Sequence, residues 1–385
     1  MSWPMVKLGS IGEFKAGFGF PIEYQGKKEG DYPFAKVGDI SAVVRSGHKN
    51  IFHAGNYIDK DILRNLKAKT IPKGTIVFAK IGEAIKQNFR AVTTVEMVID
   101  NNVMGLVPDN NLVDTNYLFY FMRSLDLYQF SGATTIPALR KSMLENIQIP
   151  LPPLSEQKRI AAILDKADSI RQKREQAIKL ADDFLRATFL EMFPQLDDCG
   201  NRVKLGDIVT LDAPMVDPRE DKFIDLIHIG PDRIEKNTGL LLSALTAREE
   251  NLISKKFLFD ESYVLYSKIR PYLKKCAIPD FSGLCSADMY PVKPIANKTN
   301  REFLWQLLLS DFFTKYTETL PDRANIPKLN RKELLNFEIS LPPFSLQENY
   351  RAIVQKINNT KSIMRIQSNN DLLNRLTDKL FSKDQ

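Results

Sequence analysis

The feature that most constrains the fold of this chain is an internal repeat. The segment "IPALRKSMLENIQIPLPP" (Ile136–Pro153) aligns without a gap with "IPKLNRKELLNFEISLPP" (Ile326–Pro343), and 9 of 18 positions are identical. Unrelated segments of this length share about one residue, so the match indicates duplication. The copies lie 190 residues apart, which is far too long a period for a solenoid. The chain is therefore expected to consist of two similar halves.

Weaker matches extend the repeat along the chain. "VKLGSI" (Val6–Ile11) returns as "VKLGDI" (Val203–Ile208), 197 residues later. "IVFAKIGEAIKQ" from Ile76 resembles "VLYSKIRPYLKK" from Val264. The drift in spacing indicates small insertions in one half. The pattern predicts domain duplication, in which each half is a globular part followed by a helix.

Each globular part is expected to have mixed α and β structure. Gly74–Gly82 and Asn101–Pro108 have the β-branched and aromatic content of strands. Asp114–Gly132 has the pattern of a helix, with Asp114 or Thr115 as its N-cap and the final glycine as its end. The second half repeats this order with the strands Tyr263–Ile269 and Ser286–Pro294 and the helix Asn300–Tyr316.

A long helix is expected to follow each globular part. The double proline that closes each repeat segment ends the strand, because proline lacks a backbone N–H. Ser155 and Ser345 can then act as N-caps by accepting hydrogen bonds from the first free amides. No proline or glycine interrupts the stretch from about Glu156 to Phe193, or from Leu346 to the C-terminus. Each helix can therefore reach about 55 Å.

Apolar residues along both helices predict that the helices pair with each other. They lie at spacings of three, four and seven on a narrow stripe with charged flanks, which is typical of a coiled coil. In a pseudo-twofold arrangement the two helices would run antiparallel. The alternative is that each helix packs on its own globular part, although such helices usually show a broader apolar face. The stripe consists of Ile160, Leu164, Ala167, Ile178, Ala181, Leu185, Thr188 and Met192 on the first helix and Ile353, Ile357, Thr360, Met364, Leu373, Leu376 and Leu380 on the second.

The composition is that of a globular chain with room for about two to three domains. The 385 residues are 43% hydrophobic and carry a net charge of +7, which permits nucleic-acid binding without proving it. The clearest local basic segment is Ser267–Lys275, with four cations and no acidic residue. No apolar run of about 18 residues occurs, so no transmembrane helix and no membrane partner are expected.

Cysteine usage and the N-terminus predict a cytoplasmic protein. The N-terminal segment "MSWPMVKLGS" has no apolar signal core. Cys199, Cys276 and Cys285 show no paired metal spacing, so we interpret them as reduced thiols.

Motifs that would indicate catalysis are absent from the sequence. No Asn-Pro-Pro-Tyr-like or Asp-Pro-Pro-Tyr-like methylation loop occurs, and no phosphate-binding loop of the GxxxxGK[ST] type is present. "GFGF" (Gly17–Phe20) lacks a third glycine and is better explained as a loop. His48, His53 and His228 have no ligand partners at metal-binding spacing. The sequence therefore predicts a binding protein with no catalytic residues, no metal and no cofactor of its own.

The sequence around both joins resembles the specificity subunit of type I restriction–modification enzymes. "IQIPLPPLSEQKRIAAILDKAD" is similar to the conserved region that follows a target-recognition domain, and "ATTIPALRKSMLENIQIP" to the end of such a domain. "GTIVFAKIGEAIKQN", "IDNNVMGL", "LCSADMYPVKP" and "RANIPKLNRKELLNFEISLPPFSLQE" resemble further segments, so the resemblance covers essentially the whole chain. The second join departs from the usual "PPLxEQ", because Leu346 stands where the first copy has Glu156. This predicts a less well fixed start of the second helix.

The resemblance implies a fold of the α+β class. Two α/β target-recognition domains would be separated by two long antiparallel coiled-coil helices in a pseudo-twofold internal repeat. The expected parts are target-recognition domain 1 (1–153), the first spacer helix (154–193), target-recognition domain 2 (194–343) and the second spacer helix (344–385).

The resemblance also implies a non-catalytic subunit of a larger enzyme. Each domain would read one half of a bipartite double-stranded DNA target. The helices would set the distance between the half-sites and dock two modification (methyltransferase) subunits, which carry the S-adenosylmethionine chemistry. Restriction subunits with translocase and nuclease activity would join this core.

Basic and amide side chains near the matching strand ends are the candidate DNA contacts. Arg and Lys contact phosphates and guanine edges, whereas Asn and Gln can read adenine. The alternative for each residue is a solvated turn without a partner, and Thr134 and Thr135 can equally cap their own loop. The candidates are Lys80, Lys86, Gln87, Asn88, Arg90, Thr134 and Thr135 in the first half and Lys268, Arg270, Lys274, Lys275 and Arg323 in the second.

Two other functions compete with DNA recognition. One is the specificity part of a fused methyltransferase–nuclease, which the missing methylation loop disfavours. The other is a non-enzymatic coiled-coil adaptor with two protein-binding heads. Salt-dependent binding to a specific duplex would separate a DNA reader from an adaptor.

Overall fold

The chain folds into two compact units. A computed structural model describes residues 3–132, 136–198, 202–321, 327–369 and 372–381. Unit 1 comprises Met1–Glu175 and Ile366–Gln385, and unit 2 comprises Gln176–Arg365. The long helix α5 (Leu154–Met192) gives its N-terminal part to unit 1 and its C-terminal part to unit 2. The four-part division expected from the sequence stays a prediction, since the compact units divide α5 between them.

Unit 1 is built around a five-stranded sheet. Its strands follow the order β2 (Gly12–Ala16), β9 (Val103–Pro108), β6 (Ile76–Ala79), β7 (Arg90–Thr93) and β4 (Asn50–Ile51). All neighbours are antiparallel except β4 and β7, which are parallel. A smaller sheet has the order β5 (Tyr57–Ile58), β3 (Tyr32–Ala35) and β8 (Val98–Ile99). Strands β6 and β7 are buried along their whole lengths, and β6 is accordingly apolar throughout, whereas β7 begins with the buried Arg90.

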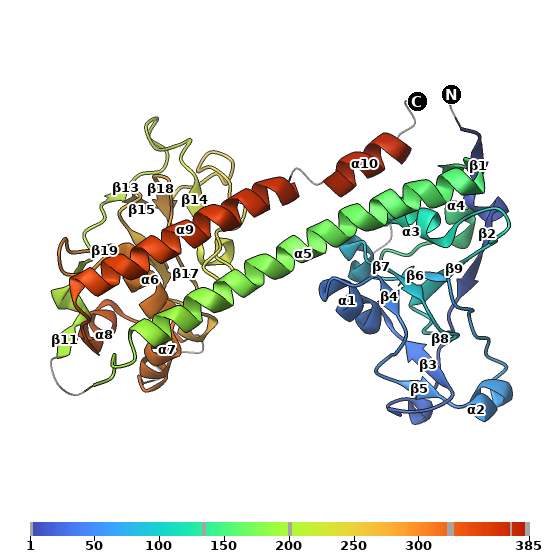
Figure 1. Ribbon diagram of the computed structural model, residues 1–385, viewed down its shortest axis with the longest axis horizontal. Coiled ribbons are helices and arrows are strands. Elements are labelled where there is room, and N and C mark those ends of the chain that lie inside the picture. The colour runs from blue at the N-terminus through green and yellow to red at the C-terminus, as the bar shows by residue number, and fades with distance from the viewer. Residues whose placement is uncertain (1–2, 133–135, 199–201, 322–326, 370–371, 382–385) are drawn as a thin grey trace. The chain divides into compact units, whose positions relative to one another are not determined.

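Helices cover unit 1 and close its core. Figure 1 shows α3 and the first part of α5 alongside the sheet, with α1 near β4. The core joins sheet residues such as Phe78 to Leu164 of α5 and Phe381 of α10. The helices are α1 (Val37–Arg45), α2 (Lys60–Asn65), α3 (Thr115–Ser124), α4 (Lys141–Glu145) and α10 (Leu372–Phe381), with 3-10 helices η1 (Leu8–Ser10), η2 (Ile22–Tyr24), η3 (Glu83–Gln87) and η4 (Leu127–Phe130).

Unit 2 has two four-stranded sheets. The first has the order β12 (Val209–Thr210), β19 (Met289–Pro294), β16 (Val264–Ser267) and β17 (Cys276–Ala277). The second has the order β13 (Met215–Val216), β15 (Lys256–Phe259), β18 (Gly283–Cys285) and β14 (His228–Ile229). The helices are α6 (Arg301–Leu309), α7 (Asp311–Glu318), α8 (Arg331–Asn336) and α9 (Phe344–Asn369), with 3-10 helices η5 (Leu205–Asp207), η6 (Pro231–Arg233) and η7 (Pro271–Leu273).

The strand order of the two units is the same at their centres. The antiparallel series β2-β9-β6-β7 of unit 1 corresponds to β12-β19-β16-β17 of unit 2. The two sequence matches at the ends of each half, the "VKLG" segment and the strand before the double proline, also pair with each other as antiparallel strands in both units. Strand β1 (Met5–Lys7) pairs with β10 (Gln148–Pro150), placing Val6 opposite Ile149. Strand β11 (Arg202–Lys204) pairs with β20 (Glu338–Ser340), placing Val203 opposite Ile339. The "VKLG" segment therefore occurs in both halves because each copy pairs with the strand that precedes a double proline.

Both long helices begin one residue earlier than the predicted serine caps. Helix α5 begins at Leu154, and the carbonyl oxygen of Pro153 accepts hydrogen bonds from the N–H groups of Glu156 and Gln157. Helix α9 begins at Phe344, and Pro343 plays the same part. The prediction that Ser155 and Ser345 are N-caps is wrong, since both serines lie inside the first helical turn.

A buried glutamine fixes each of these helix starts. The Gln157 side chain accepts a hydrogen bond from the backbone N–H of Asp114 at 2.8 Å and donates to the carbonyl oxygen of Pro152 at 2.8 Å. Gln347 accepts from the Thr299 hydroxyl at 2.8 Å and donates to Pro342 at 2.9 Å. Both glutamines are fully buried. Leu346 in place of Glu156 therefore leaves this anchor of the second helix intact.

We expect Gln157→Leu and Gln347→Leu each to destabilise the protein by about 1–3 kcal/mol, because buried partners would lose their hydrogen bonds. Urea denaturation of the full chain measures the change. Gln176→Leu is the matched control, since Gln176 is exposed on α5 and its loss should change stability by less than about 0.5 kcal/mol. Equal effects of the buried and exposed substitutions would contradict the proposed anchoring role.

The helix expected over Asp114–Gly132 is shorter in the structure. Asp114 caps α3 by accepting hydrogen bonds from the N–H groups of Asn116 and Tyr117, as predicted. The helix ends at Ser124, because Leu125 is extended and Asp126 caps the separate helix η4.

The helix expected over Asn300–Tyr316 is divided in two. Asn300 caps α6, with its side chain accepting from the N–H of Phe303 at 2.9 Å. Ser310 then has an extended backbone and its hydroxyl caps α7 by accepting from the N–H of Phe313 at 3.2 Å. A serine that looks like an ordinary helical residue therefore starts a new helix.

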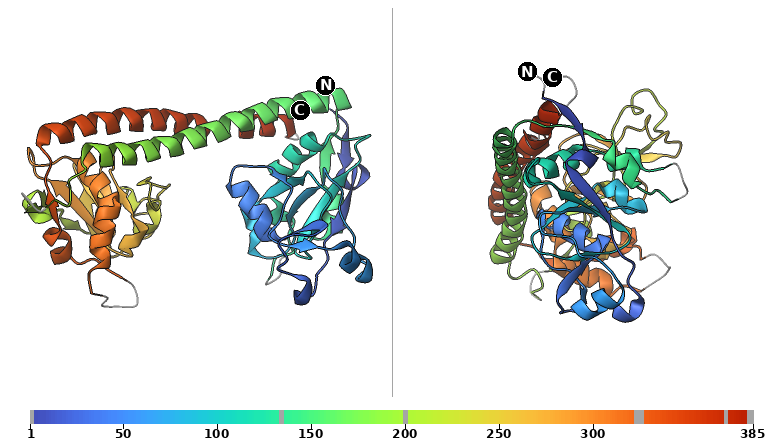
Figure 2. Two further views of the ribbon diagram at one scale, coloured as in Figure 1. Left: turned by 60° about the horizontal axis from the view of Figure 1, so that its bottom comes forward. Right: turned by 90° about the vertical axis from the view of Figure 1, so that its right-hand side faces the viewer.

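The long helices pack both on globular parts and on each other. Within unit 1, Ile160 and Leu164 of α5 are buried in the same core as the sheet. Within unit 2, the hydroxyl of Tyr350 on α9 donates to the carbonyl oxygen of Leu185 on α5, and Lys361 pairs with Asp182. Higher numbers on α9 meet lower numbers on α5, so the helices are antiparallel there, and Figure 2 shows them side by side. The alternative of packing on the globular part is thus also realised.

No helix within the described ranges has the length and apolar character needed to cross a bilayer.

Candidate nucleic-acid interface

A loop in unit 1 follows β6 and is held by backbone hydrogen bonds. We call residues 80–89 loop 1. The N–H of Gly82 donates to the carbonyl oxygen of Pro137 at 2.8 Å, and the N–H of Leu139 donates to that of Lys80 at 2.9 Å. Loop 1 contains η3 and ends in a left-handed residue, Asn88, with φ of 55°. The repeat segment before the double proline therefore forms one side of the loop.

Unit 2 builds the same frame after β16. We call residues 268–275 loop 2. The N–H of Arg270 donates to the carbonyl oxygen of Pro327 at 2.8 Å, and the N–H of Leu329 donates to that of Lys268 at 2.8 Å. Loop 2 contains η7 and also ends in a left-handed residue, Lys274, with φ of 49°. The two loops are therefore equivalent in the duplication, as the weakest of the sequence matches predicted.

Three candidate side chains of loop 1 remain available at its surface. Lys86 is exposed, with its Nζ 2.7 Å from Glu83 and 5.0 Å from the centre of the Tyr128 ring. The hydrogen bond to Glu83 raises the pKa of Lys86. Gln87 is exposed and accepts one hydrogen bond from Arg45 at 3.1 Å. Lys80 is half-buried, and its side chain forms no hydrogen bond or ion pair within the part of the chain that the structure describes.

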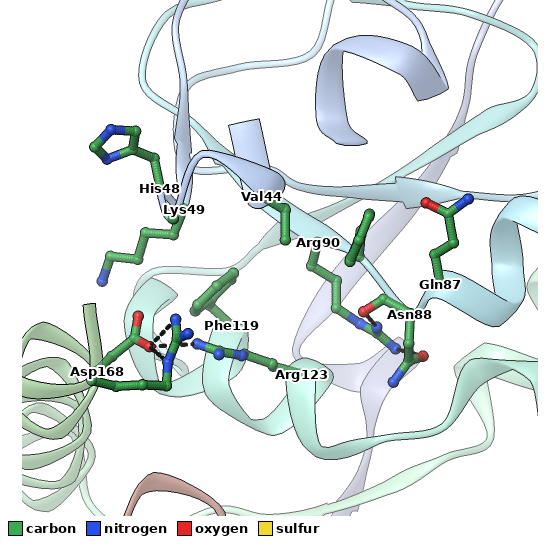
Figure 3. Close-up of a pocket in the computed structure, with 12 residues that line it drawn as sticks. Val44, His48, Lys49, Gln87, Asn88, Arg90, Phe119, Arg123 and Asp168 are labelled. Carbon is green, nitrogen blue, oxygen red and sulfur yellow. Dashed lines mark hydrogen bonds and ion pairs between the residues drawn. The ribbon is translucent and has the colours of Figure 1, made fainter. Parts of the chain in front are cut away.

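Asn88 and Arg90 instead stabilise the loop from inside. The Arg90 guanidinium donates to the Asn88 side-chain oxygen at 2.7 Å and to the carbonyl oxygen of Leu125 at 2.8 Å, as Figure 3 shows for Asn88. The Asn88 amide donates to the same Leu125 carbonyl at 2.8 Å. Arg90 is only 3% exposed. We assign both residues to the architecture of loop 1 and leave them out of the surface that we propose to read bases.

Three lysines of loop 2 are also engaged within the protein. Lys268 donates to the carbonyl oxygen of Ala287 at 2.5 Å. Lys274 forms an ion pair with Asp311, and its bond lowers the pKa of that carboxyl group. Lys275 donates to the carbonyl oxygen of Pro231 at 2.6 Å. These contacts hold the loop to neighbouring elements, so the basic charge of the segment is largely internal.

Arg270 is the exception in loop 2. Its side chain is exposed and forms no hydrogen bond or ion pair with any described residue. Its backbone has φ of 50°, in the left-handed region that disfavours side chains, whereas the equivalent residue of loop 1 is Gly82 with φ of 83°. The protein therefore holds an arginine in a strained conformation without an internal contact for its side chain. Such strain is typical of functional positions.

Other candidates lie outside the described part of the chain. These are Thr134 and Thr135 after the first helix region and Arg323 in the equivalent segment of unit 2. One surface residue escaped the sequence analysis. Tyr272 follows Pro271 on loop 2 and is 51% exposed. The sequence signal that could have identified Tyr272 is its position as an aromatic residue directly after a proline, inside a basic turn.

The described residues contain no group of three or more His, Cys, Asp and Glu side chains that could hold a metal ion. Cys276 and Cys285 are free and buried, and burial raises the pKa of both thiols. His228 does have a carboxylate neighbour, with its Nδ1 2.7 Å from Glu250, although the two lie 22 residues apart in sequence. One carboxylate and one imidazole do not complete a metal site.

Comparison with known protein families decides the relationship. A family model described as the type I restriction modification DNA specificity domain matches the chain twice, over residues 2–180 and 202–374. The chain belongs to this family. It is a DNA specificity subunit of a type I restriction–modification system, a non-catalytic role, and membership implies DNA and the other subunits of such a system as partners. The adaptor alternative is not favoured by this match.

Individual relatives agree with the family match. The specificity subunit of the type I restriction enzyme EcoDI from Escherichia coli is 27% identical, over 71% of this chain and 69% of the relative. The MjaIX specificity subunit from Methanocaldococcus jannaschii is 22% identical, over 96% of this chain and 91% of the relative. The crystal structure of an S subunit from M. genitalium has a TM-score of 0.57 at 16% identity, covering 100% of this chain and 97% of that one. This last likeness concerns the fold.

Proposed function

We propose that each unit of this specificity subunit reads one half of a bipartite double-stranded DNA target, unit 1 through loop 1 and unit 2 through loop 2. The observation that carries the proposal is that one backbone frame is built twice with different exposed side chains. Sequence is read by side chains at base edges, whereas a fixed frame only positions them. Two equal frames with unequal side chains suit two different half-sites.

The proposed contacts follow from exposure and pairing. In loop 1 the proposed contacts are the exposed Lys86 and Gln87 and the half-buried Lys80. The same loop exposes Glu83, which pairs with Lys86. Arg270 and Tyr272 are the proposed contacts of loop 2. An arginine can bind a guanine edge with two parallel hydrogen bonds, and an exposed tyrosine ring can stack or contact a thymine methyl group. The three lysines of loop 2 stabilise the loop and are not among the proposed contacts.

The long helices are proposed to act as the spacer between the half-sites. They would pair as an antiparallel coiled coil over the whole chain and relate the two units by a pseudo-twofold axis. The antiparallel contacts of α9 with α5 inside unit 2 support this arrangement. Two modification subunits would dock on this core, and restriction subunits would join them. Native mass spectrometry of the assembled complex gives the number of each subunit.

The proposal is tested by mapping methylated sites in cells that carry this chain with its modification subunit. A two-part target with a fixed spacer is expected. Lys86→Ala should relax or weaken one half of the target, and Arg270→Gly should affect the other half alone. If both substitutions alter the same half, or neither alters the mapped target, the two loops are not the reading surfaces.

Arg270→Gly has an unusual combination of expected effects. Loss of a paired base contact should weaken binding to the specific duplex by about 1–3 kcal/mol and relax one position of the half-site. Stability should stay equal or rise by up to about 1 kcal/mol, because glycine accepts the positive φ that arginine tolerates poorly. Binding titrations on a panel of mutated half-sites and thermal unfolding measure the two effects.

Asn297→Gly serves as the control for backbone strain. Asn297 is exposed in unit 2, has φ of 64° and lies outside loop 2. Its replacement should leave DNA binding unchanged. If Arg270→Gly lowers stability and leaves the DNA target unchanged, Arg270 is a structural residue and the assignment is wrong. A shallower salt dependence with uniform loss over all sequences would instead indicate a phosphate contact.

A further inference from the structure

A cavity of about 280 Å³ lies inside unit 1 between loop 1 and helix α5. One wall is the end of loop 1, from Gln87 to Arg90, and another is the turn after α1 that carries Lys49. Arg123 of α3 and two residues of α5, Asp168 and Arg171, close it. Figure 3 shows these side chains around one space, with Arg123 pointing toward Asp168.

Positive charge dominates the lining. Lys49, Arg90, Arg123 and Arg171 line the cavity together with one carboxylate, Asp168. Two of these cations also have acidic partners outside the lining, because Lys49 pairs with Asp165 and Arg171 with Glu175. One oxygen of Asp168 accepts from Arg123 at 3.1 Å and from Arg171 at 3.0 Å. Although burial opposes ionisation of Asp168, these two arginines hold its pKa below the usual value. A single carboxylate is thus shared by two guanidinium groups.

Arg90 forms no hydrogen bond or ion pair with a carboxylate among the described residues, although Asp126 lies near enough for its charge to act on Arg90. Its described acceptors are the backbone and side-chain oxygens of Asn88 and the carbonyl oxygen of Leu125, all of them neutral. Its Nε–H is buried and finds no acceptor in the described structure. The pKa of Arg90 is lowered to about 9, mainly by burial; the carboxylate of Asp126 opposes this shift and the positive charge of Arg123 adds to it. A buried guanidinium with an unsatisfied N–H is costly, so the hydrogen bonding of the site is incomplete.

We propose that this cavity is a binding site for a phosphate-class oxyanion. A tetrahedral oxyanion offers several charged acceptors to converging guanidinium donors, which is the pairing that arginine favours. The anion would accept a hydrogen bond from the free Nε–H of Arg90 and add negative charge to a lining that holds four cations and one carboxylate. The cavity has room for it, since a water molecule occupies only about 30 Å³ of liquid volume.

The phosphate can come from either of two sources. A backbone phosphate of bound DNA would lie next to loop 1, because Gln87 and Asn88 belong both to loop 1 and to the cavity wall. This source rests on the proposed function. A free phosphate or the phosphate of a small molecule does not depend on it. The two sources predict different results in DNA-binding measurements.

The test uses the full chain, with inorganic phosphate compared with sodium chloride at matched ionic strength. Phosphate should raise the thermal unfolding temperature of the unmodified protein above the chloride value. Arg90→Gln should weaken phosphate binding roughly tenfold or more, because a charged hydrogen-bond donor is lost. Asp168→Asn should strengthen it, since the one carboxylate of the lining becomes neutral. The Asp168→Asn variant keeps the proposal testable if Arg90→Gln does not fold.

Arg64→Gln is the matched control. Arg64 lies on α2 in the same unit, is exposed and pairs with Asp61 at 3.7 Å. The Arg64→Gln variant should keep the full rise in unfolding temperature that phosphate causes in the unmodified protein. Free-phosphate binding at this site is overturned if phosphate does not raise the unfolding temperature of the unmodified protein. It is also overturned if the Arg90→Gln variant keeps the full stabilisation by phosphate. Equal loss in the Arg64→Gln control places the anion elsewhere and also overturns it.

Salt titrations of DNA binding by the assembled complex distinguish the sources. If the anion is a DNA phosphate, Arg90→Gln should reduce the slope of log affinity against log salt by about 0.9. An unchanged slope together with phosphate-dependent stabilisation supports a free phosphate ligand. An unchanged slope without stabilisation refutes the site altogether. Neither result bears on the proposal that loops 1 and 2 read the DNA target. That proposal is tested by mapping the methylated target of the Arg270→Gly and Lys86→Ala variants.

Discussion

Replacing Asp182 with alanine is expected to destabilise unit 2 by about 3–5 kcal/mol, because it leaves a buried ammonium group without its partner. Asp182 of α5 pairs with Lys361 of α9 inside unit 2, and the two side chains are only 10% and 5% exposed. Burial lowers the pKa of Lys361, while Asp182 opposes that shift. Asn358 is the other described acceptor near the ammonium group, at 3.3 Å. The neutral amide cannot replace the lost charge.

Hydrogen exchange of the amides in α9 is the direct measurement, because it reports opening of this helix pair separately from the rest of the chain. Asp183→Ala is the neighbouring control. Asp183 forms an exposed ion pair with Arg186 and should contribute no more than about 1 kcal/mol. If both alanine variants change exchange equally, the buried pair has no special role.

A double substitution separates pairing from net stabilisation. Asp182→Leu with Lys361→Met replaces both charges by apolar groups, which in other buried pairs is neutral or stabilising by about 1–4 kcal/mol. We expect the double variant to be at least as stable as the unmodified protein, in contrast to Asp182→Ala. Such a result would mean that the pair selects the register of α9 on α5 more than it strengthens the contact.

Much of the fold could be predicted because local chemistry and tertiary structure agree. Strands β6 and β9 of unit 1 and their equivalents β16 and β19 of unit 2 were expected from their β-branched content, and all four are present. The helix boundaries were harder. Ser155 resembles an N-cap by residue type, yet the preceding proline already supplies the first helical carbonyl. Ser310 resembles a helical residue, yet it caps a second helix.

The candidate interface could be predicted only in outline. The sequence shows which residues are basic, whereas pairing depends on partners that are distant in sequence. Lys274 pairs with Asp311 and Lys275 with the carbonyl of Pro231, which lie 37 and 44 residues away. Arg90 is buried by the turn of Leu125, 35 residues away. Arg270 differs from the other cations of its loop because its side chain has no hydrogen bond or ion pair with any described residue, although Lys274 shares its positive φ.

The middle of α5 offers the sharpest test of the proposed spacer role. Residues 169–181 contribute no buried side chain to either unit among the described residues, whereas Ala167 and Asp182 on either side are buried. Removing the seven residues 173–179 preserves the heptad phase of the helix. It should shorten the helix by about 10 Å, which corresponds to roughly three base pairs at about 3.4 Å each.

Methylation mapping should then show a bipartite target whose half-sites are unchanged and whose spacer differs by about three base pairs. A companion variant removes residues 363–369 as well, which is the equivalent heptad of the second helix. A control replaces residues 173–179 by another helical heptad of the same length and should keep the original spacer. A folded, active deletion variant that still methylates the original spacer would show that α5 does not set the distance. Loss of one half-site would mean instead that the deletion disturbs a reading unit, because the spacer role predicts a change in separation without a change in either sequence read.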